Sequence, residues 1–436
     1  MGATTIALAL CPRMSPNPGS SHVTTSPPGL AQPASTKRGK TRSLVILLLC
    51  QVGAMSVWFS SSAVVAIVRQ VQGISALQAT LLTSAVQAGF VAGTITSALL
   101  SLADRYDPRR LFMTSALVAG SATACLAFIE PAGVAAIALR FLTGMCMAGV
   151  YPVGMRLAAT WANRDLGLLI GLLVGALTFG SASPHLLAAL GGSSWRAIYA
   201  IAALCALLAG IAILLCDVGP TMARATRIQW SALAGAWRNP ALRLANLGYL
   251  GHMWELYAMW AWLAVFLQTS FAAAGISHAR QAAEWLTFAA VAAGALGAWL
   301  GGVLADRVGR TTVTIGAMAV SGACAAVMGW LLGAPVWLVV GVALVWGVSV
   351  IADSAQFSAS IAELAEPNSI GTLLTAQTCA GFLLTLVSIH LVPDVVAFAG
   401  WPGAFSMLAA GPFLGCIAMA RLRRHPDARR LAGGKG

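Results

Sequence analysis

The chain has 436 residues, of which 58% are hydrophobic and only 9% are charged, and its mean hydropathy is +0.82. A soluble domain carries about a quarter charged residues, so this composition excludes an ordinary soluble protein. Stretches of roughly 20 apolar residues recur, which is the length that a helix needs to cross a bilayer. Such stretches are too long for barrel strands, and we therefore expect an all-α integral membrane protein.

The formal net charge of +13 could indicate a nucleic-acid partner. The charges lie in the tails and in the loops between apolar spans, however, so membrane topology accounts for them better and we expect no nucleic acid. All nine cysteines except Cys11 lie within apolar runs. Cysteines in such runs serve as small hydrophobic residues, and we expect no disulfides.

Residues 1–42 are polar, rich in Ser, Thr and Pro, and end in a basic cluster. This composition predicts a disordered N-terminal tail. Twelve apolar spans follow, with boundaries uncertain by a few residues. They cover residues 43–67, 77–100, 110–129, 132–154, 166–190, 195–216, 244–267, 282–302, 312–332, 335–357, 368–392 and 396–420.

Basic residues are distributed unequally between alternate loops. Twenty-two of the 26 Lys and Arg residues lie in the two tails and one set of loops, whereas Arg69, Arg196 and Arg280 lie in the other set. Because basic residues accumulate on the cytoplasmic side, both termini are expected in the cytoplasm and the spans in the inner membrane.

The longest internal loop, 217–243, separates the sixth span from the seventh. It predicts an N-terminal six-helix bundle at 43–216 and a C-terminal one at 244–420, followed by a basic cytoplasmic tail at 421–436. Within the loop, Trp230, Leu233 and Trp237 have helical spacing. An amphipathic helix on the membrane surface and an irregular basic linker are both compatible with this pattern.

A nine-residue sequence at 302–310, Gly-Val-Leu-Ala-Asp-Arg-Val-Gly-Arg, lies between two spans. A weaker copy at 102–110 lies between two earlier spans, and its Asp104 precedes Asp306 by about half the chain. This recurrence predicts two related bundles. The first copy has Leu100 where the first glycine is expected, and Asp107-Pro108 replaces the second.

The 302–310 sequence resembles G-x-L-A-D-R-x-G-R/K, the loop motif between the second and third helices of major facilitator superfamily transporters. The resemblance implies 12 transmembrane helices in two pseudo-symmetric six-helix bundles. It also implies a cavity lined by spans one, four, seven and ten that opens to one side at a time. A cytoplasmic gate is implied as well, formed by five residues of the two loops: Asp104, Arg105, Asp306, Arg307 and Arg310.

Arg140 lies inside span four, about eight residues from its start and so roughly 12 Å deep. Arg140-x3-Gly144, followed by Ala148-Gly149, resembles the fourth-helix Arg motif of the same superfamily, which is linked to the substrate cavity and to proton coupling. A guanidinium keeps its charge and needs an anion or several carbonyls as partners. We expect a functional role, and the alternative is a packing residue bound to backbone carbonyls.

Span seven carries a polar and aromatic stripe at helical spacing: Tyr249, His252, Glu255, Met259 and Trp262. Glu255 lies near mid-bilayer, where a low dielectric favours the neutral carboxyl group, so it could take up and release a proton. His252, one turn away, could share that proton, and the aromatic rings could bind a cation. The alternative is that Glu255 and His252 only pair with each other or with the arginine of span four.

Asp353, His185 and His390 are further titratable side chains within spans. Asp353, late in span ten, could face the cavity, and it could equally cap or pair helices. His185 and His390 lie near the outer ends of their spans, and we favour structural roles for both. Span five also has glycines at four-residue spacing, which predict close helix packing: Gly167, Gly171 and Gly175.

The sequence contains no P-loop, no metal-ligand spacing and no nucleophile elbow. We therefore predict no enzyme activity, no metal and no cofactor. The expected function is monomeric, secondary active transport of a small molecule, coupled to protons, with an organic anion as substrate and Arg140 as its counter-charge. Proton-driven efflux of hydrophobic or cationic compounds is the alternative, and a transporter-like membrane receptor is a different class of function.

Overall fold

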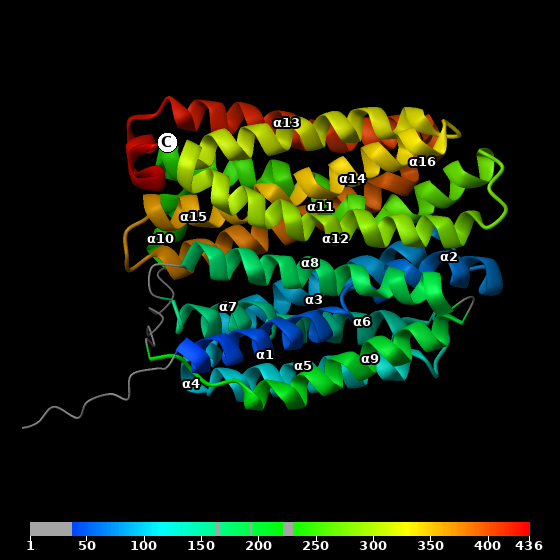
Figure 1. Cartoon of the computed structure of the whole chain (residues 1–436), viewed down its shortest axis with the longest axis horizontal. Helices are drawn as coiled ribbons and strands as arrows, with labels where there is room; N and C mark the ends of the chain where they lie inside the picture. Colours follow the sequence, from blue (N-terminus) through cyan, green and yellow to red (C-terminus); the bar gives the residue numbers. More distant parts are fainter. Residues whose placement is uncertain (1–36, 132, 163–165, 192–193, 221–229) are drawn as a thin grey trace, which may run out of the picture.

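The computed structural model describes residues 37–131, 133–162, 166–191, 194–220 and 230–436, and these ranges are almost entirely helical. The helices form two bundles that lie side by side with their axes nearly parallel, one built from each half of the sequence (Figure 1). The predicted disordered tail lies outside the described residues except for its basic end, which is helical from Lys37 onward. The first helix therefore begins before the predicted boundary at residue 43.

The N-terminal bundle contains nine α-helices in the described ranges and one short 3₁₀ turn. They are α1 (Lys37–Met55), α2 (Ser60–Gln72), α3 (Ala76–Leu99), α4 (Leu102–Arg105), α5 (Pro108–Leu126), α6 (Val134–Met147), α7 (Tyr151–Ala159), α8 (Leu166–Gly191), α9 (Trp195–Ala212) and η1 (Ile213–Leu215).

The second half begins with a short helix in the predicted linker, so the linker is helical from Trp230 to Arg238, whereas its described residues 217–220 are not. The elements are α10 (Trp230–Arg238), α11 (Pro240–Ala273), α12 (Ala279–Val308), α13 (Arg310–Met328), η2 (Gly329–Leu331), α14 (Val336–Ala352), α15 (Ser354–Leu364), α16 (Ile370–Arg423) and η3 (Pro426–Gly434).

Ten helical stretches in the described part of the chain are long and apolar enough to cross a membrane. The third predicted span corresponds to α5, which is not among these ten. Spans eleven and twelve are both contained in α16, where Gly400 has a φ of +66° that interrupts the helical geometry. Glycine adopts such a backbone without steric cost, so it marks the boundary between the two spans. With α5 included and α16 divided, each predicted span has a helical counterpart.

Three of the four spans expected to line a cavity are interrupted. The first breaks between α1 and α2, the fourth between α6 and α7, and the tenth at Asp353, between α14 and α15. Each break releases backbone carbonyls from helical hydrogen bonds, and in a membrane such groups need other partners. Polar side chains that face these breaks are therefore under strong physical constraint.

Glycines bring helices together within the N-terminal bundle. A Cβ atom on Gly144 of α6 would lie 1.9 Å from the carbonyl oxygen of Val86 on α3, and one on Gly89 would lie 1.9 Å from that of Phe141. No larger side chain fits at either position without movement of the backbone. Gly144 belongs to the motif that begins at Arg140, so the motif also serves helix packing.

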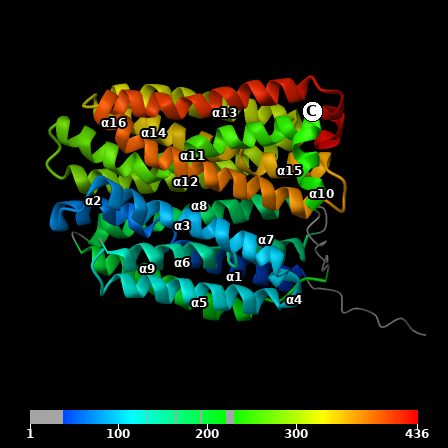
Figure 2. The ribbon, with the colours of Figure 1, turned by 180° about the vertical axis from the view of Figure 1, so that it is seen from behind.

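The two bundles meet mainly along two pairs of helices, α8 with α12 and α3 with α16, and α2 also contacts α11. Figure 1 shows α8 beside α12. Figure 2, which views the molecule from behind, shows α3 beside part of α16. Gly175 of α8 faces α12, where an added Cβ would lie 3.4 Å from the Cβ of Ala295. The glycine spacing of span five thus provides a close contact between the bundles as well as close packing.

Candidate functional site

Arg140 is fully buried, and its guanidinium reaches the break between α1 and α2. Its four hydrogen bonds end on one hydroxyl and three carbonyls: Ser60 Oγ at 3.1 Å, Val57 O at 2.8 Å, Leu82 O at 3.2 Å and Trp58 O. This is the carbonyl-bound arrangement considered as the alternative for Arg140. The hydrogen bonds solvate the positive charge, but none of these partners neutralises it.

Glu255 is also buried, with 1% of its surface exposed. Its carboxylate accepts hydrogen bonds from Trp346 Nε1 at 2.7 Å and from Ser321 Oγ at 2.9 Å, on α14 and α13. Both partners are neutral and belong to the C-terminal bundle. The structure therefore does not pair Glu255 with Arg140, and each half contains an ionisable group without an opposite charge bonded to it.

His252 and Asp353, both predicted site residues, come together in the tertiary structure. Nδ1 of His252 lies 2.9 Å from Oδ1 of Asp353, and both side chains are 1% exposed. The contact joins α11 to the break between α14 and α15. The other ring nitrogen of His252 has no hydrogen-bond partner among the described residues. His252 thus pairs with Asp353 rather than with Glu255.

The two aromatic residues of the stripe lie within the C-terminal bundle. Trp262 donates a hydrogen bond from Nε1 to the carbonyl of Ile389 on α16, at 3.0 Å. The Tyr249 ring lies 6.3 Å from that of His252 and lines a cavity of about 420 Å³ between α10, α11 and α16. The predicted stripe therefore faces the interior of its own bundle.

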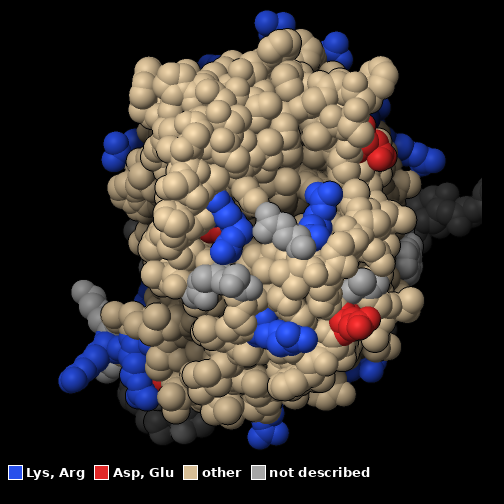
Figure 3. Space-filling model, turned by 90° about the vertical axis from the view of Figure 1, so that its right-hand side faces the viewer, with Lys and Arg blue, Asp and Glu red and all other residues tan. Residues whose placement is uncertain are grey.

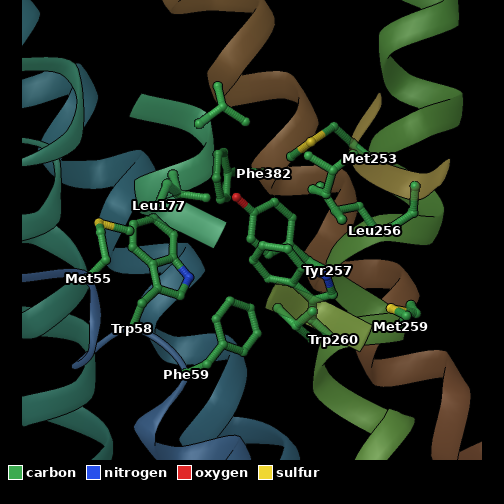
Figure 4. Packing of buried hydrophobic residues seen from close by; sticks show 14 of the residues in the cluster. Met55, Trp58, Phe59, Leu177, Met253, Leu256, Tyr257, Met259, Trp260 and Phe382 are labelled. Carbon is green, nitrogen blue, oxygen red and sulfur yellow. The ribbon is translucent and has the colours of Figure 1, made fainter. Parts of the chain in front are cut away.

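A different face of α11 meets the N-terminal half, through Tyr257 and Trp260 (Figure 4). Six aromatic side chains, which we call the central aromatic cluster, join the bundles at this level: Trp58, Phe59, Phe90, Tyr257, Trp260 and Phe382. Neighbouring rings lie close together, at 4.5 Å for Phe90 and Phe382 and at 5.3 Å for Phe59 and Trp260. In this conformation, side chains rather than open space fill the contact between the halves at this point.

Sequence reasoning missed this cluster. Span seven has aromatic residues on more than one face, so periodicity does not identify the face that meets the other bundle. Trp58 and Trp260 share a second feature, because their buried indole N–H groups have no acceptor in the described part of the structure. An unsatisfied buried donor costs roughly 1–3 kcal/mol, so a ligand that carries an acceptor would be favoured here.

The predicted gate residues are mostly not engaged with one another. Arg310 forms a bidentate pair with Glu363 of α15, at 2.6 and 2.8 Å, and donates to Gln356 Oε1 at 2.8 Å. These partners belong to its own bundle. Asp306 and Arg307 are exposed, and Lys435 Nζ donates to the backbone carbonyl of Asp306.

In the first loop copy, the side chain of Asp104 lies outside the described residues, and Arg105 is exposed. The substituted position, Asp107, caps α5 by accepting a hydrogen bond from the backbone N–H of Arg109 at 2.8 Å. The hydrogen-bonded guanidinium of Arg109 holds the pKa of Asp107 below its usual value. Asp107, which replaces the motif residue, thus serves as the N-terminal cap of α5.

We expect Arg310→Lys to slow turnover about tenfold in reconstituted vesicles, because lysine cannot form the bidentate pair with Glu363. Asp306→Asn, which removes a carboxylate with no ion pair among the described residues, should have a smaller effect. Initial rates at saturating substrate would compare the two variants. Equal losses would contradict the expectation that the pair between Arg310 and Glu363 contributes more to turnover than Asp306 does.

Comparison with known families supports the architecture described above. Residues 47–388 match the family described as Major Facilitator Superfamily, a match that includes most of both bundles. A comparison with curated proteins gave no match. The protein is an integral, multi-pass membrane protein with a helical fold, and it is a secondary transporter of small molecules. The chain belongs to the major facilitator superfamily.

Proposed function

We propose that this protein transports a small organic anion with an apolar body, together with a proton, by alternating access between its two bundles. The observation that carries the proposal is the central aromatic cluster, to which both bundles contribute. Aromatic faces bind an apolar body, and the indole N–H groups of Trp58 and Trp260 would donate to its acidic oxygens. The inner membrane, with both termini in the cytoplasm, is the proposed location.

The charge of Arg140 favours an anion at this position. Its guanidinium donates to the carbonyl of Trp58, the residue whose indole ring belongs to the cluster. Because its partners are carbonyls and a hydroxyl, the side chain retains a net positive charge. Charges interact strongly in a medium of low dielectric, so an anion beside Trp58 would be attracted without direct contact with Arg140.

Glu255 would couple the anion to a proton. When its carboxylate is ionised, the C-terminal half holds a negative charge that opposes an anionic substrate. A proton on Glu255 removes that charge. The oxygens of the neutral carboxyl group can still accept hydrogen bonds from Trp346 and Ser321. Proton and anion would then increase the affinity for each other by the same factor, as thermodynamic linkage requires.

Efflux of hydrophobic or cationic compounds is the second candidate function. The same rings could bind a cation over their faces, and an ionised Glu255 would then act as the counter-charge. The two candidates differ in the sign of the substrate charge that they favour, so a pair of probes with the same ring and opposite permanent charges separates them.

Reconstituted vesicles with an internal pH dye would test the proposal. Benzenesulfonate, a permanent anion, should drive proton entry into vesicles that contain the protein and not into empty ones. Trimethylphenylammonium, a cation of similar size, should have little effect. The variant Trp58→Phe keeps the ring and loses the donor, and it should weaken the response to the anion. A response to the cation alone would support efflux instead.

A further inference from the structure

The α2 helix begins with three buried serines, and each contacts a side chain from a different helix of the N-terminal bundle. The pairs are Ser60 with Arg140 of α6 at 3.1 Å, Ser61 with Tyr199 of α9 at 2.9 Å, and Ser62 with His185 of α8 at 3.4 Å. These serines directly follow the break that carries Trp58 and Phe59. A movement of the backbone at any of these three serines would therefore also move Trp58 and Phe59 of the central aromatic cluster.

His185 also bridges the two bundles. Its Nδ1 atom lies 2.6 Å from Oε2 of Glu284 on α12, and the two side chains are 1% and 2% exposed. This ion pair connects the N-terminal half to the C-terminal half. Sequence reasoning favoured a structural role for His185 and did not single out Glu284.

His185 lies near the C-terminal end of α8, and Glu284 lies near the N-terminal end of α12. Figure 1 shows these helix ends, which we call the outer ends, at the end of the molecule away from the C-terminus. Close contacts flank the pair. The rings of Phe179 and Phe288 lie 5.7 Å apart, and Gln281 donates to the carbonyl of Ala189 at 3.0 Å. Figure 3 views this end and shows a surface with scattered charged residues. The pair is thus enclosed in a packed contact between the bundles.

The hydrogen-bond partners constrain the protonation of the pair. The hydroxyl of Ser62 donates to the carbonyl of Phe59 at 2.8 Å, so its oxygen can only accept from His185. Nε2 must then carry a proton, and Nδ1 needs another if it donates to an ionised Glu284. The arrangement is therefore an imidazolium with a carboxylate, or a neutral imidazole with a carboxylic acid. Either form holds one proton more than a neutral histidine with a carboxylate.

We propose that His185 and Glu284 form a proton-binding site that holds the bundles together at their outer ends and releases them when it takes up a second proton. This proposal rests on the proton-coupled transport proposed above and adds a second site to it. A second proton would leave an imidazolium beside a neutral carboxylic acid. The ionic attraction between α8 and α12 would then be lost, and the outer ends could separate.

Breaking the pair without a proton would be costly, because it would leave two buried charges apart in a low dielectric. The neighbouring titratable groups are Arg280, one turn away on α12, Tyr199 of α9, and Arg140 of α6. Tyr199 and Arg140 contact the two serines that precede Ser62. Opening of the outer ends would thus shift Ser62 and, with it, the Phe59 carbonyl at the edge of the cluster.

Hydrogen exchange of the full-length protein in lipid nanodiscs would test the proposal, since it needs no substrate. Exchange at residues 184–191 and 279–288 would be followed between about pH 5 and 8, with correction for the intrinsic effect of pH. We expect exchange in the unmodified protein to rise several-fold as the pH falls. Glu284→Gln cannot form the ion pair, so its exchange should be high at every pH. Glu130→Gln, which changes an exposed carboxyl group at the same end, should behave as the unmodified protein does.

A Glu284→Gln variant with low exchange and an unchanged pH profile would overturn the proposal. If that variant does not fold, His185→Gln provides the same test, because it also removes the titrating pair. The two proposals can fail separately. Glu255→Gln should retain the pH-dependent exchange at the outer ends, and loss of that dependence in Glu255→Gln alone would transfer the proton site to Glu255. Normal opening without proton-driven transport would contradict only the proposed function.

Discussion

Vesicles that contain Glu255→Gln are expected to lose the pH dependence that arises from proton coupling, so an imposed pH gradient should no longer drive substrate entry. Glutamine is nearly isosteric with glutamate, and its amide oxygen can accept the hydrogen bond from Trp346. The fold should therefore persist, whereas the side chain can no longer take up a proton. Initial rates of substrate entry, with and without an imposed pH gradient, would measure the effect.

A matched control distinguishes this coupling role from a general effect of charge. Glu130→Gln removes an exposed carboxyl group at the end of the molecule away from the C-terminus, and we expect it to keep the pH dependence of the unmodified protein. If Glu255→Gln also kept that dependence, Glu255 would have no part in coupling. If Glu255→Gln lost its thermal stability, the carboxyl group would be required for packing, and the transport result would not test its role in coupling.

Arg140→Lys is expected to reduce transport more than tenfold and to lower the thermal stability. The guanidinium reaches four acceptors in several directions, and an ammonium group on a single stem cannot bond all of them. Each carbonyl left unsatisfied in the buried break costs roughly 1–3 kcal/mol. The break between α1 and α2 would lose its geometry, and with it the position of Trp58.

Arg196→Lys is the appropriate comparison. Arg196 donates to one carbonyl, that of Ala127 at 3.1 Å, and lies 4.5 Å from the ring of Trp195 at the outer end of α9. Its replacement should change stability by about 1 kcal/mol or less. Thermal denaturation and transport would be measured for both variants. An Arg140→Lys protein as stable and as active as Arg196→Lys would show that the carbonyl contacts of Arg140 are dispensable.

The bundle architecture could be predicted because it depends on patterns along the chain. Span length, the distribution of basic residues and the recurrence of the 302–310 motif are local properties, and each is set by the thickness and the asymmetry of the membrane. The glycine pattern of span five predicted close packing, and Gly175 does face the other bundle. The boundaries were less well predicted, since α1 begins at Lys37 and spans eleven and twelve form one interrupted helix.

The site was only partly predictable. Ionisable residues within apolar spans are rare enough to be recognised individually, and Arg140, His252, Glu255 and Asp353 are indeed buried. Their partners could not be deduced. His252 contacts Asp353, whereas Glu255 contacts Trp346 and Ser321. Helical periodicity places residues on a common face but does not say which neighbour that face meets.

The amino-acid sequence alone therefore established that the chain is a set of membrane-spanning helices in two related halves, because the cost of burying polar groups in lipid constrains every span separately. The central aromatic cluster and the pair between His185 and Glu284 arise only when the bundles pack together. Their residues lie far apart in the sequence. Their properties depend on which groups are buried where α8 packs against α12 and where α11 packs against the N-terminal bundle. No pattern within a single helix contains that information.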